Sequence, residues 1–346
     1  MTLRIPVKSE MQAHPGGGKI MAINASFQRE VDYLRISVTD RCNFRCKYCM
    51  PPDGVDYKSH DEIMRYEEIL IFARIAVKAG IKRIRLTGGE PLVRRGLDKL
   101  IYQLNKLEGL EDISLTTNGY LLPEYANKLA RVGLDRINVS LDTLDREKFK
   151  EISLVDGLPE VLAGLKAAQN AGLNPIKLNT VLIRGFNDNE VSDFIKFTKA
   201  HNYNFRFIEF MPLNGSSQDN DSKYISIDEI KARIKSAGFK LTPAEIPGGG
   251  PATSYQIDDT QATVGFISPI SHSFCSSCNR LRLTSDGKLR PCLAMAKEYD
   301  LYDQSGNLLP EDKLKEILDQ ACSLKPDHHD FANEEDYGRN MSQIGG

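Results

Sequence analysis

The chain has 346 residues, of which 41% are hydrophobic and 27% are charged, a composition that excludes a mainly disordered protein. With 45 basic and 47 acidic residues, its formal net charge is −2, so the whole chain lacks the electrostatic signature of a nucleic-acid-binding or membrane-binding protein. No apolar run approaches the roughly 20 residues that a membrane helix needs. The length allows two or three domains, or one large α/β barrel with an addition. Any anionic ligand must be bound by a local cluster of basic residues.

The first 28 residues lack the hydrophobic core of a signal peptide, and Glu10 argues against a transit peptide. We therefore interpret residues 1–28 as a mobile N-terminal extension.

Between Tyr33 and Met211, short β-rich segments alternate with longer helical ones. Strands are predicted at residues 33–39, 83–87, 112–116, 136–140, 176–182 and 204–210. Helical periodicity covers residues 66–79, 96–107, 123–132, 158–171 and 189–201. Three of these helices end on a glycine followed by an aliphatic residue, which is a signal of helix termination: Gly80–Ile81, Gly133–Leu134 and Gly172–Leu173. Repeated strand–helix–strand units imply a parallel sheet, so six strands predict an incomplete (βα)6 TIM-like barrel or a doubly wound sheet.

The predicted strands alternate polar and apolar residues, although buried parallel strands usually read as continuous apolar runs. In the first strand, Arg35 and Ser37 share one face while Leu34 and Ile36 share the other. Later strands add further polar residues to that face: Arg83, Arg85, Thr87, Ser114, Thr116, Asn138, Ser140, Lys177 and Asn179. This pattern indicates a wet cavity for a polar, anionic ligand inside an open barrel. A half-solvated antiparallel sheet is the alternative, which the intervening helices disfavour.

The sixth strand departs from the alternation. Arg206 would share its face with Ile208, which predicts a bulge or a twist near residues 206–209.

After Met211 the pattern changes. Residues 227–238 fit one amphipathic helix, and short strands are predicted around residues 254–257 and 263–267. A hairpin follows, in which residues 279–284 and 288–290 flank the turn Asp286–Gly287. We therefore predict an α+β region at residues 212–346, after a barrel domain at residues 29–211.

The seven cysteines are an odd number, which argues against a secreted disulfide framework and favours a reducing, cytoplasmic compartment. Six of them form two triplets, and Cys322 stands alone.

The first triplet, Cys42, Cys46 and Cys49, directly follows the first predicted strand, where α/β proteins bind their ligands. Three closely spaced thiolates suit a [4Fe–4S] cluster, because they hold three irons and leave the fourth iron open. A structural zinc site would want a fourth ligand, and the nearest candidate, His60, has no supporting spacing. Buried cysteines without a metal would have no reason to adopt this spacing.

The second triplet consists of Cys275, Cys278 and Cys292, and the predicted hairpin returns Cys292 toward Cys278. Since no fourth ligand is evident, a second cluster with an open iron is favoured over zinc. Arg280 and Arg282 share one face of the hairpin strand beside these ligands and suit a polyphosphate. The alternative for the two arginines is a solvated basic edge strand.

The first triplet and the turn Thr87-Gly88-Gly89-Glu90-Pro91 together resemble the radical S-adenosylmethionine (SAM) superfamily over about residues 33–211. A closer resemblance is to the GTP 3′,8-cyclase family of molybdenum cofactor biosynthesis. It rests on LRISVTDRCNFRCKYCMP at 34–51, RLTGGEPL at 85–92, TTNG at 116–119, NVSLD at 138–142, RFIEFM at 206–211, the CxxC-NRLRL-SDGK-C block and the final Gly345–Gly346.

The resemblance implies a radical SAM barrel whose C-terminal extension carries the second iron–sulfur cluster. In that family the first cluster reduces SAM to methionine and a 5′-deoxyadenosyl radical, which takes the 3′ hydrogen of GTP before the 3′ carbon attacks C8 of guanine. The second cluster binds the guanine end. Residues matching SAM contacts are Tyr48, Gly89, Ser140 and Met211. Residues matching the GTP site are Arg35, Arg85, Thr116, Lys177, Arg280 and Arg282, with Arg206, Gly345 and Gly346 as further candidates near the reaction.

The resemblance also implies several partners. These are an electron donor of the flavodoxin or ferredoxin type, a downstream cyclic pyranopterin monophosphate synthase and a second copy of the chain in a homodimer. No nucleic-acid or membrane partner is expected.

Two rival hypotheses for the function stay open. A peptide-modifying radical SAM enzyme with an auxiliary cluster would not depend on GTP, and a zinc-stabilised binding module would not cleave SAM.

Overall fold

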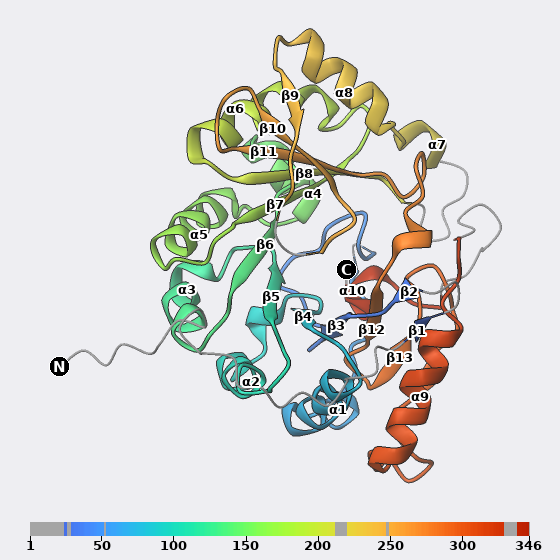
Figure 1. The fold of residues 1–346 in the computed structure, drawn as a ribbon. Coiled ribbons are helices and arrows are strands. Elements are labelled where there is room, and N and C mark those ends of the chain that lie inside the picture. The colour runs from blue at the N-terminus through green and yellow to red at the C-terminus, as the bar shows by residue number, and fades with distance from the viewer. Residues whose placement is uncertain are drawn as a thin grey trace, which may run out of the picture.

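The computed structural model describes residues 24–25, 29–51, 53–211, 220–246, 249–328 and 338–345. Its main feature is a 12-stranded sheet in the order β14-β13-β12-β3-β4-β5-β6-β7-β8-β11-β10-β9 (Figure 1). The central strands are parallel to one another: β12 (Arg280–Leu283), β3 (Tyr33–Ser37), β4 (Arg83–Thr87), β5 (Asp112–Thr117), β6 (Arg136–Ser140), β7 (Lys177–Leu182), β8 (Asn204–Glu209) and β11 (Thr263–Ile267). The outer strands are antiparallel to their neighbours: β13 (Lys288–Arg290), β14 (Tyr299–Asp300), β10 (Thr253–Ile257) and β9 (Leu241–Pro243).

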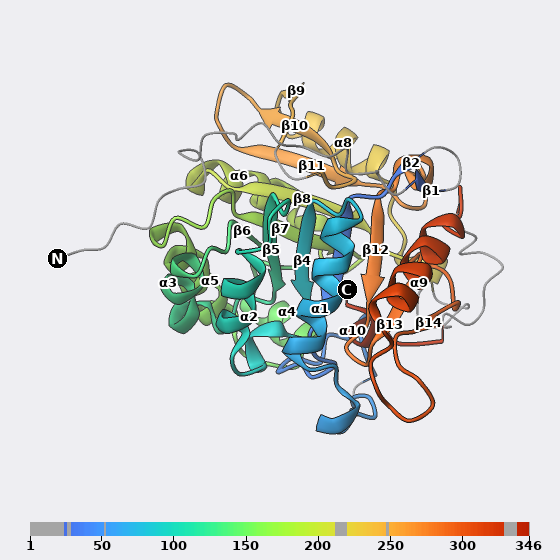
Figure 2. The same cartoon turned by 60° about the horizontal axis from the view of Figure 1, so that its bottom comes forward.

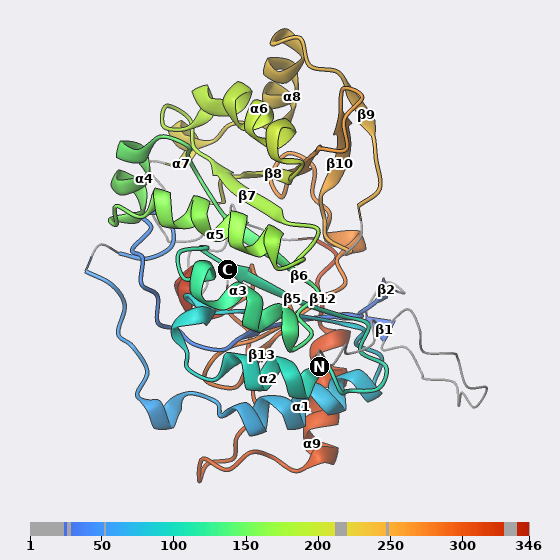
Figure 3. The ribbon, with the colours of Figure 1, turned by 90° about the vertical axis from the view of Figure 1, so that its left-hand side faces the viewer.

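Helices between the parallel strands cover the outside of the curved sheet, as Figure 3 shows for α1, α2, α3 and α5. They are α1 (Tyr66–Lys78), α2 (Leu97–Leu104), α3 (Leu122–Arg131), α4 (Arg146–Ser153), α5 (Leu158–Asn170) and α6 (Val191–His201). Later helices are α7 (Asn220–Lys223), α8 (Ile227–Ser236), α9 (Glu311–Ser323) and α10 (Met341–Ile344). Short 3-10 segments are η3 (His60–Glu62), η4 (Pro91–Val93), η5 (Asp188–Glu190) and η6 (Cys275–Ser277). The predicted incomplete parallel barrel is confirmed, and α4 is an addition to the predicted helices.

The three predicted helix stops are confirmed by backbone hydrogen bonds. The amides of Ile81, Leu134 and Leu173, each directly after a glycine, donate to carbonyls five residues earlier at 2.9–3.1 Å. This bond pattern closes the last helical turn, and all three aliphatic side chains are buried.

Strands from the C-terminal region join both edges of the barrel. β11 lies parallel beside β8, and β12 lies parallel beside β3. The parallel set therefore grows beyond the six strands of the repeat, and it stays open because β11 and β12 lie at opposite ends of it (Figure 2). The predicted hairpin is confirmed as β12 and β13, which pair antiparallel.

The bulge predicted near residues 206–209 is wrong. β8 keeps an unbroken register with both neighbours, so Arg206 lies opposite Asn179 and Gly265. A Cβ atom at Gly265 would lie only 2.9 Å from Cγ of Arg206, so the glycine provides the room for this long side chain. Ile208 shares the inner face with Arg206, which shows that this face is not polar throughout.

The core lies between the sheet and the outer helices. Leu34 and Ile36 of β3 are fully buried in it, as are Ile84 and Leu86 of β4, which confirms the predicted apolar face. Of the predicted N-terminal extension, residues 1–23 and 26–28 lie outside the described residues. Asn24–Ala25 (β1) pairs with Arg29–Glu30 (β2). Among the described helices, none has the length and apolar character needed to cross a bilayer.

Candidate active site

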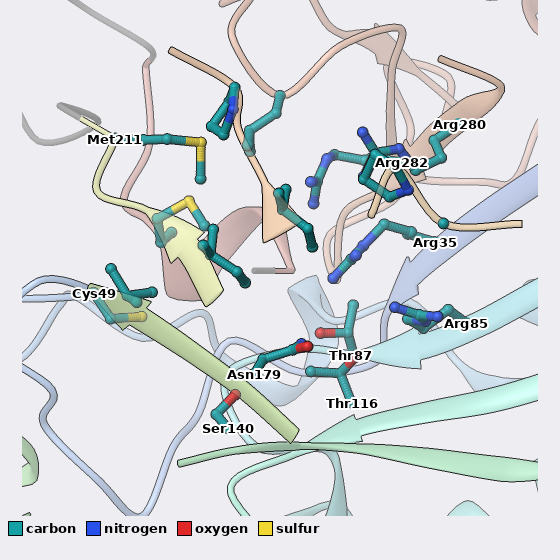
Figure 4. A pocket seen from close by; sticks show the side chains of 18 of the residues that line it. Arg35, Cys49, Arg85, Thr87, Thr116, Ser140, Asn179, Met211, Arg280 and Arg282 are labelled. Atoms are coloured by element: carbon teal, nitrogen blue, oxygen red, sulfur yellow. The ribbon is translucent and has the colours of Figure 1, made fainter. Parts of the chain in front are cut away.

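A large cavity opens inside the curved sheet, and all six cysteines of the two triplets line it. Figure 4 shows Cys49 and Met211 on one side of this cavity and Arg35, Arg280 and Arg282 on the other. The structure thus brings two sulfur-rich groups and a cationic wall together in one space. The predicted residues that line it are Arg35, Tyr48, Arg85, Gly89, Thr116, Ser140, Arg206, Met211, Arg280 and Arg282.

The loop that carries the first triplet is held by the glycine turn after β4. The amide of Gly89 donates to the carbonyl of Thr39 at 2.8 Å, and the amide of Glu90 donates to the carbonyl of Arg41 at 2.8 Å. A Cβ atom at position 89 would lie 2.4 Å from the carbonyl oxygen of Arg41, so the two backbone segments approach closely only because residue 89 is glycine. The turn therefore fixes the position of Cys42, which follows Arg41 directly.

The thiols of the first triplet are half-buried and close enough to influence one another. Burial raises the pKa of Cys42 to about 11 and that of Cys49 to about 12, and it raises the pKa of Cys46 as well. A raised pKa means that the environment disfavours the negatively charged thiolate. The positive charge of bound irons would stabilise the thiolates of the triplet.

The donor set of the first triplet suits an iron–sulfur cluster. Cys42, Cys46 and Cys49 line one cavity, and three thiols are the soft ligands that a [4Fe–4S] cluster takes when one of its irons stays open. A structural zinc site has four protein ligands around one ion. The residues present at the first triplet therefore fit a cluster.

The second triplet is presented by η6 and by the β12–β13 hairpin. Cys275 and Cys278 flank one turn, in which the amide of Cys278 donates to the carbonyl of Cys275 at 3.1 Å. Burial raises the pKa of Cys278, but the charges of Arg280 and Lys325 outweigh it and lower the pKa to about 6. Burial raises the pKa of Cys292.

Two residues on the first-triplet side form a hydrogen-bonded pair. The hydroxyl of Tyr48 donates to Oδ2 of Asp142 at 2.7 Å, and the other oxygen of Asp142 accepts from the amide of Val181 at 2.9 Å. Burial raises the pKa of Asp142 to about 6. Asp142 is the only carboxylate among the described residues that line the cavity.

The opposite side of the cavity is a row of guanidinium groups. Arg282 of β12, Arg35 of β3 and Arg85 of β4 lie directly opposite one another across three adjacent strands, and all three are buried. Like charges in this arrangement repel, and burial adds the cost of lost hydration. Burial, followed by the charge of Arg280, lowers the pKa of Arg282 to about 9. The row is therefore a site that an anionic ligand would stabilise.

Lys177 is placed apart from the other predicted GTP contacts. It lines a small neighbouring cavity together with Arg206 and Gly250 instead of the large one. Burial and the charges of Arg206 and Arg136 lower the pKa of Lys177 to about 6. Arg206 lines both cavities and donates to Oδ1 of Asn138 at 2.7 Å.

The C-terminal segment enters the barrel. α10 carries the chain to Gly345, whose carbonyl oxygen accepts hydrogen bonds from Arg282 at 2.6 Å and from Arg35 at 3.4 Å. Figure 1 shows α10 inside the curve of the sheet. Gly346 lies outside the described residues.

We expect Gly345→Val to dislodge this segment. Gly345 has a φ of +74°, and a Cβ atom there would lie 2.7 Å from Cγ2 of Thr87 and 3.2 Å from Cβ of Ser37. The expected result is an at least tenfold loss of nucleotide cyclisation with unchanged iron content, measured by product chromatography and iron analysis. The control is Gly338→Ala, which has a similar φ of +71° but whose Cβ would lie 3.9 Å from its nearest neighbour. Equal activity of the two variants would contradict a role for the tail.

Several residues of the site were not predicted from the sequence: Tyr33, Asn118, Asp142, Val181 and Lys325. Asp142 ends the NVSLD motif, and that motif was a usable signal for it. Lys325 had no local signal, because its partners lie more than 30 residues away.

The comparisons with known proteins agree with this geometry. The family model described as Radical SAM superfamily matches residues 36–198, and the one described as Molybdenum Cofactor Synthesis C matches residues 203–331. The solved structure of Streptococcus suis SuiB bound to precursor peptide SuiA has a TM-score of 0.59 at 15% identity, covering 87% of this chain and 66% of that one. This likeness concerns the fold.

Curated relatives are much closer in sequence. The GTP 3′,8-cyclase of Petrotoga mobilis is 46% identical over 321 residues, which cover 92% of this chain and 99% of the relative. That of Moorella thermoacetica is 47% identical over 322 residues, covering 93% and 99%.

An open parallel barrel with a three-cysteine loop after its first repeat strand defines the class of radical SAM enzymes, and this chain is one of them. Within that class, the chain belongs to the GTP 3′,8-cyclase family. Its cofactors are accordingly SAM and [4Fe–4S] clusters.

Proposed function

We propose that this chain converts GTP into (8S)-3′,8-cyclo-7,8-dihydroguanosine 5′-triphosphate, the first step of molybdenum cofactor biosynthesis. The observation that carries the proposal is the buried row of Arg282, Arg35 and Arg85 in the same cavity as two cysteine triplets. A triphosphate is the kind of ligand that such a row requires, because its charge offsets the repulsion and the guanidinium groups bind phosphate bidentately.

Cys42, Cys46 and Cys49 would hold the first cluster, leaving one iron for SAM. When bound, this cluster and SAM supply the one-electron chemistry that removes a hydrogen atom from the substrate. The chain's own contribution is position and shielding. Residues proposed to contact SAM are Tyr48, Gly89, Ser140 and Met211. The bond from Tyr48 to Asp142 fixes this wall of the cavity.

The cationic row would bind the triphosphate and thereby set the depth of the ribose in the cavity. Residues proposed to contact GTP are Arg35, Arg85, Thr116, Arg280 and Arg282. Lys177 and Arg206 would add positive charge from the adjoining small cavity. A substrate held at its phosphates by several fixed groups is oriented at its reacting carbon, which is how positioning lowers a barrier.

Cys275, Cys278 and Cys292 would hold the second cluster, whose open iron is proposed to bind the guanine end of GTP. The nucleotide would then be fixed at the base, by this cluster, and at the phosphates, by the arginines. Arg280 connects the two sites, because it follows Cys278 by two residues and lines the cavity beside it.

The peptide-modifying alternative is not favoured. SuiB shares the fold at 15% identity, whereas curated relatives at 46–47% identity over almost their whole length carry the cyclase name. Zinc-stabilised binding is disfavoured by the family membership.

The resemblance supports further proposals about context. The proposed partners are a flavodoxin- or ferredoxin-like electron donor and a cyclic pyranopterin monophosphate synthase that takes up the product. The chain is proposed to form a homodimer. We also propose a division into a barrel domain at residues 29–211 and a C-terminal region at residues 212–346. We propose a cytoplasmic location, which agrees with the seven cysteines being free of disulfides.

The test is an anaerobic assay of the reconstituted chain with SAM and a strong reductant, with and without GTP. The expected result is formation of 5′-deoxyadenosine and a cyclised nucleotide in equal amounts, both dependent on GTP. ATP serves as the matched control nucleotide, since it offers the same triphosphate with a different base. Deoxyadenosine without any nucleotide product would contradict GTP as the substrate.

A further inference from the structure

Lys325 is a buried lysine next to the second triplet. It follows α9, a helix on the outside of the barrel (Figure 2), and only 2% of the residue is exposed. Its side chain nevertheless reaches the large cavity and lines it. A lysine is seldom this buried unless its ammonium group has specific partners.

The ammonium group of Lys325 contacts both cysteine-bearing arms of the hairpin. Its Nζ donates to the carbonyl of Arg280 at 2.7 Å, to the carbonyl of Pro291 at 3.1 Å and to Sγ of Cys278 at 3.4 Å. Arg280 follows Cys278 by two residues, and Pro291 directly precedes Cys292. The three donors of one ammonium therefore connect the segments of two proposed ligands.

Arg29 connects the third ligand to the same point. Its Nη2 donates to the carbonyl of Lys325 at 2.8 Å, and its Nη1 donates to the carbonyl of Cys275. Arg29 is also buried. Each of the three cysteine-bearing segments is thus hydrogen-bonded to Lys325, either directly or through Arg29.

We propose that Lys325 is a positioning residue for the second cluster that also raises its reduction potential. This inference rests on the proposed function, because it takes the second triplet as a cluster site. Hydrogen bonds to the ligand sulfurs and nearby charge are two of the factors that set the potential of an iron–sulfur cluster. One-electron reduction of the cluster by an external reductant adds a negative charge. The ammonium favours that reduced state, and no proton has to move.

The experiment uses the full chain with Cys42, Cys46 and Cys49 replaced by alanine, so that only the second cluster assembles. The parent, Lys325→Met, Lys325→Arg and the control Lys313→Met are reconstituted anaerobically and titrated with dithionite, with the reduced cluster followed by electron paramagnetic resonance. Lys313 is a suitable control because it lies on α9 with an exposed side chain that pairs with Glu316.

Lys325→Met is expected to lower the equilibrium constant for reduction at least tenfold, a shift of about 59 mV for one electron. Lys325→Arg retains the charge and should shift less, and Lys313→Met should not shift. A parental potential in Lys325→Met would overturn the proposal, since a purely structural lysine would not affect the potential. If Lys325→Met takes up no iron, Lys325→Gln is titrated instead. A parental reduction potential in Lys325→Gln would overturn the proposal in the same way.

The failure of the proposed function has a different signature. If the parent with the three alanine replacements bound no iron at all, the second triplet itself would be wrongly assigned. That result involves no change at Lys325 and is therefore distinct from failure of the lysine's role.

Discussion

Replacement of Cys46 by alanine is expected to reduce SAM cleavage below detection and to remove about four iron atoms per chain, the content of one [4Fe–4S] cluster. The reason is the number of ligands. The first triplet has three cysteines around one side of the cavity, and no other Cys or His in the described part of the chain lines that side to replace a lost thiolate. The measurements are 5′-deoxyadenosine by chromatography and iron by a colorimetric assay.

The matched control is Cys322→Ala. Cys322 is as buried as any residue of the core, but it lies on α9 and outside the cavity. Its replacement removes a similar sulfur atom and should cost about 1–2 kcal/mol of stability through lost packing, with iron content and SAM cleavage retained. Deoxyadenosine formation that survives in Cys46→Ala would contradict the assignment of the first triplet.

Local sequence signals were sufficient for the central barrel because each signal has a local cause. The alternation around Arg35 and Ile36 follows from one face of β3 meeting helices and the other meeting the cavity. α4 was missed because only Phe149, Ile152 and Ser153 of its eight residues are buried, which is too few for a clear helical pattern. The pairing of β11 and β12 with opposite edges of the barrel depends on long-range contacts that no local periodicity records.

The site was predictable to the extent that its chemistry lies in compact motifs. The six ligand cysteines follow short spacings, so their grouping is visible in the sequence. The contacts of Lys325 and of the C-terminal Gly345 join segments far apart in the chain, and only the fold brings them together. The bulge expected at Arg206 assumed a uniformly polar inner face, but Ile208 and Val181 show that part of the cavity wall is apolar.

Replacement of Arg282 by methionine should weaken GTP binding by about 30- to 5000-fold, which corresponds to about 2–5 kcal/mol for losing one partner of a buried, hydrogen-bonded charge pair. Arg282 is buried beside Arg35 on the neighbouring strand, so no solvent is at hand to replace the lost contact with the ligand. The variant Arg282→Lys, which keeps the charge but lacks the planar fork of the guanidinium group, should lose less affinity. Equilibrium dialysis of the anaerobic protein with labelled GTP measures the affinity.

The same replacement by methionine removes one of three like charges buried side by side, but it also removes the 2.6 Å hydrogen bond to the carbonyl of Gly345. Because these two effects oppose each other, the free energy of unfolding of the GTP-free protein should change by no more than about 1 kcal/mol. Arg290 on the next strand offers the opposite control. Its side chain is fully buried, but it pairs with Glu298 at 2.7 Å and does not line the cavity. Arg290→Met should therefore lower the free energy of unfolding by about 2–3 kcal/mol and leave the GTP affinity of the folded protein unchanged. A parental GTP affinity in Arg282→Met would contradict the assignment of the triphosphate to this row. A phosphate bound there should lose affinity when one of its guanidinium groups is removed.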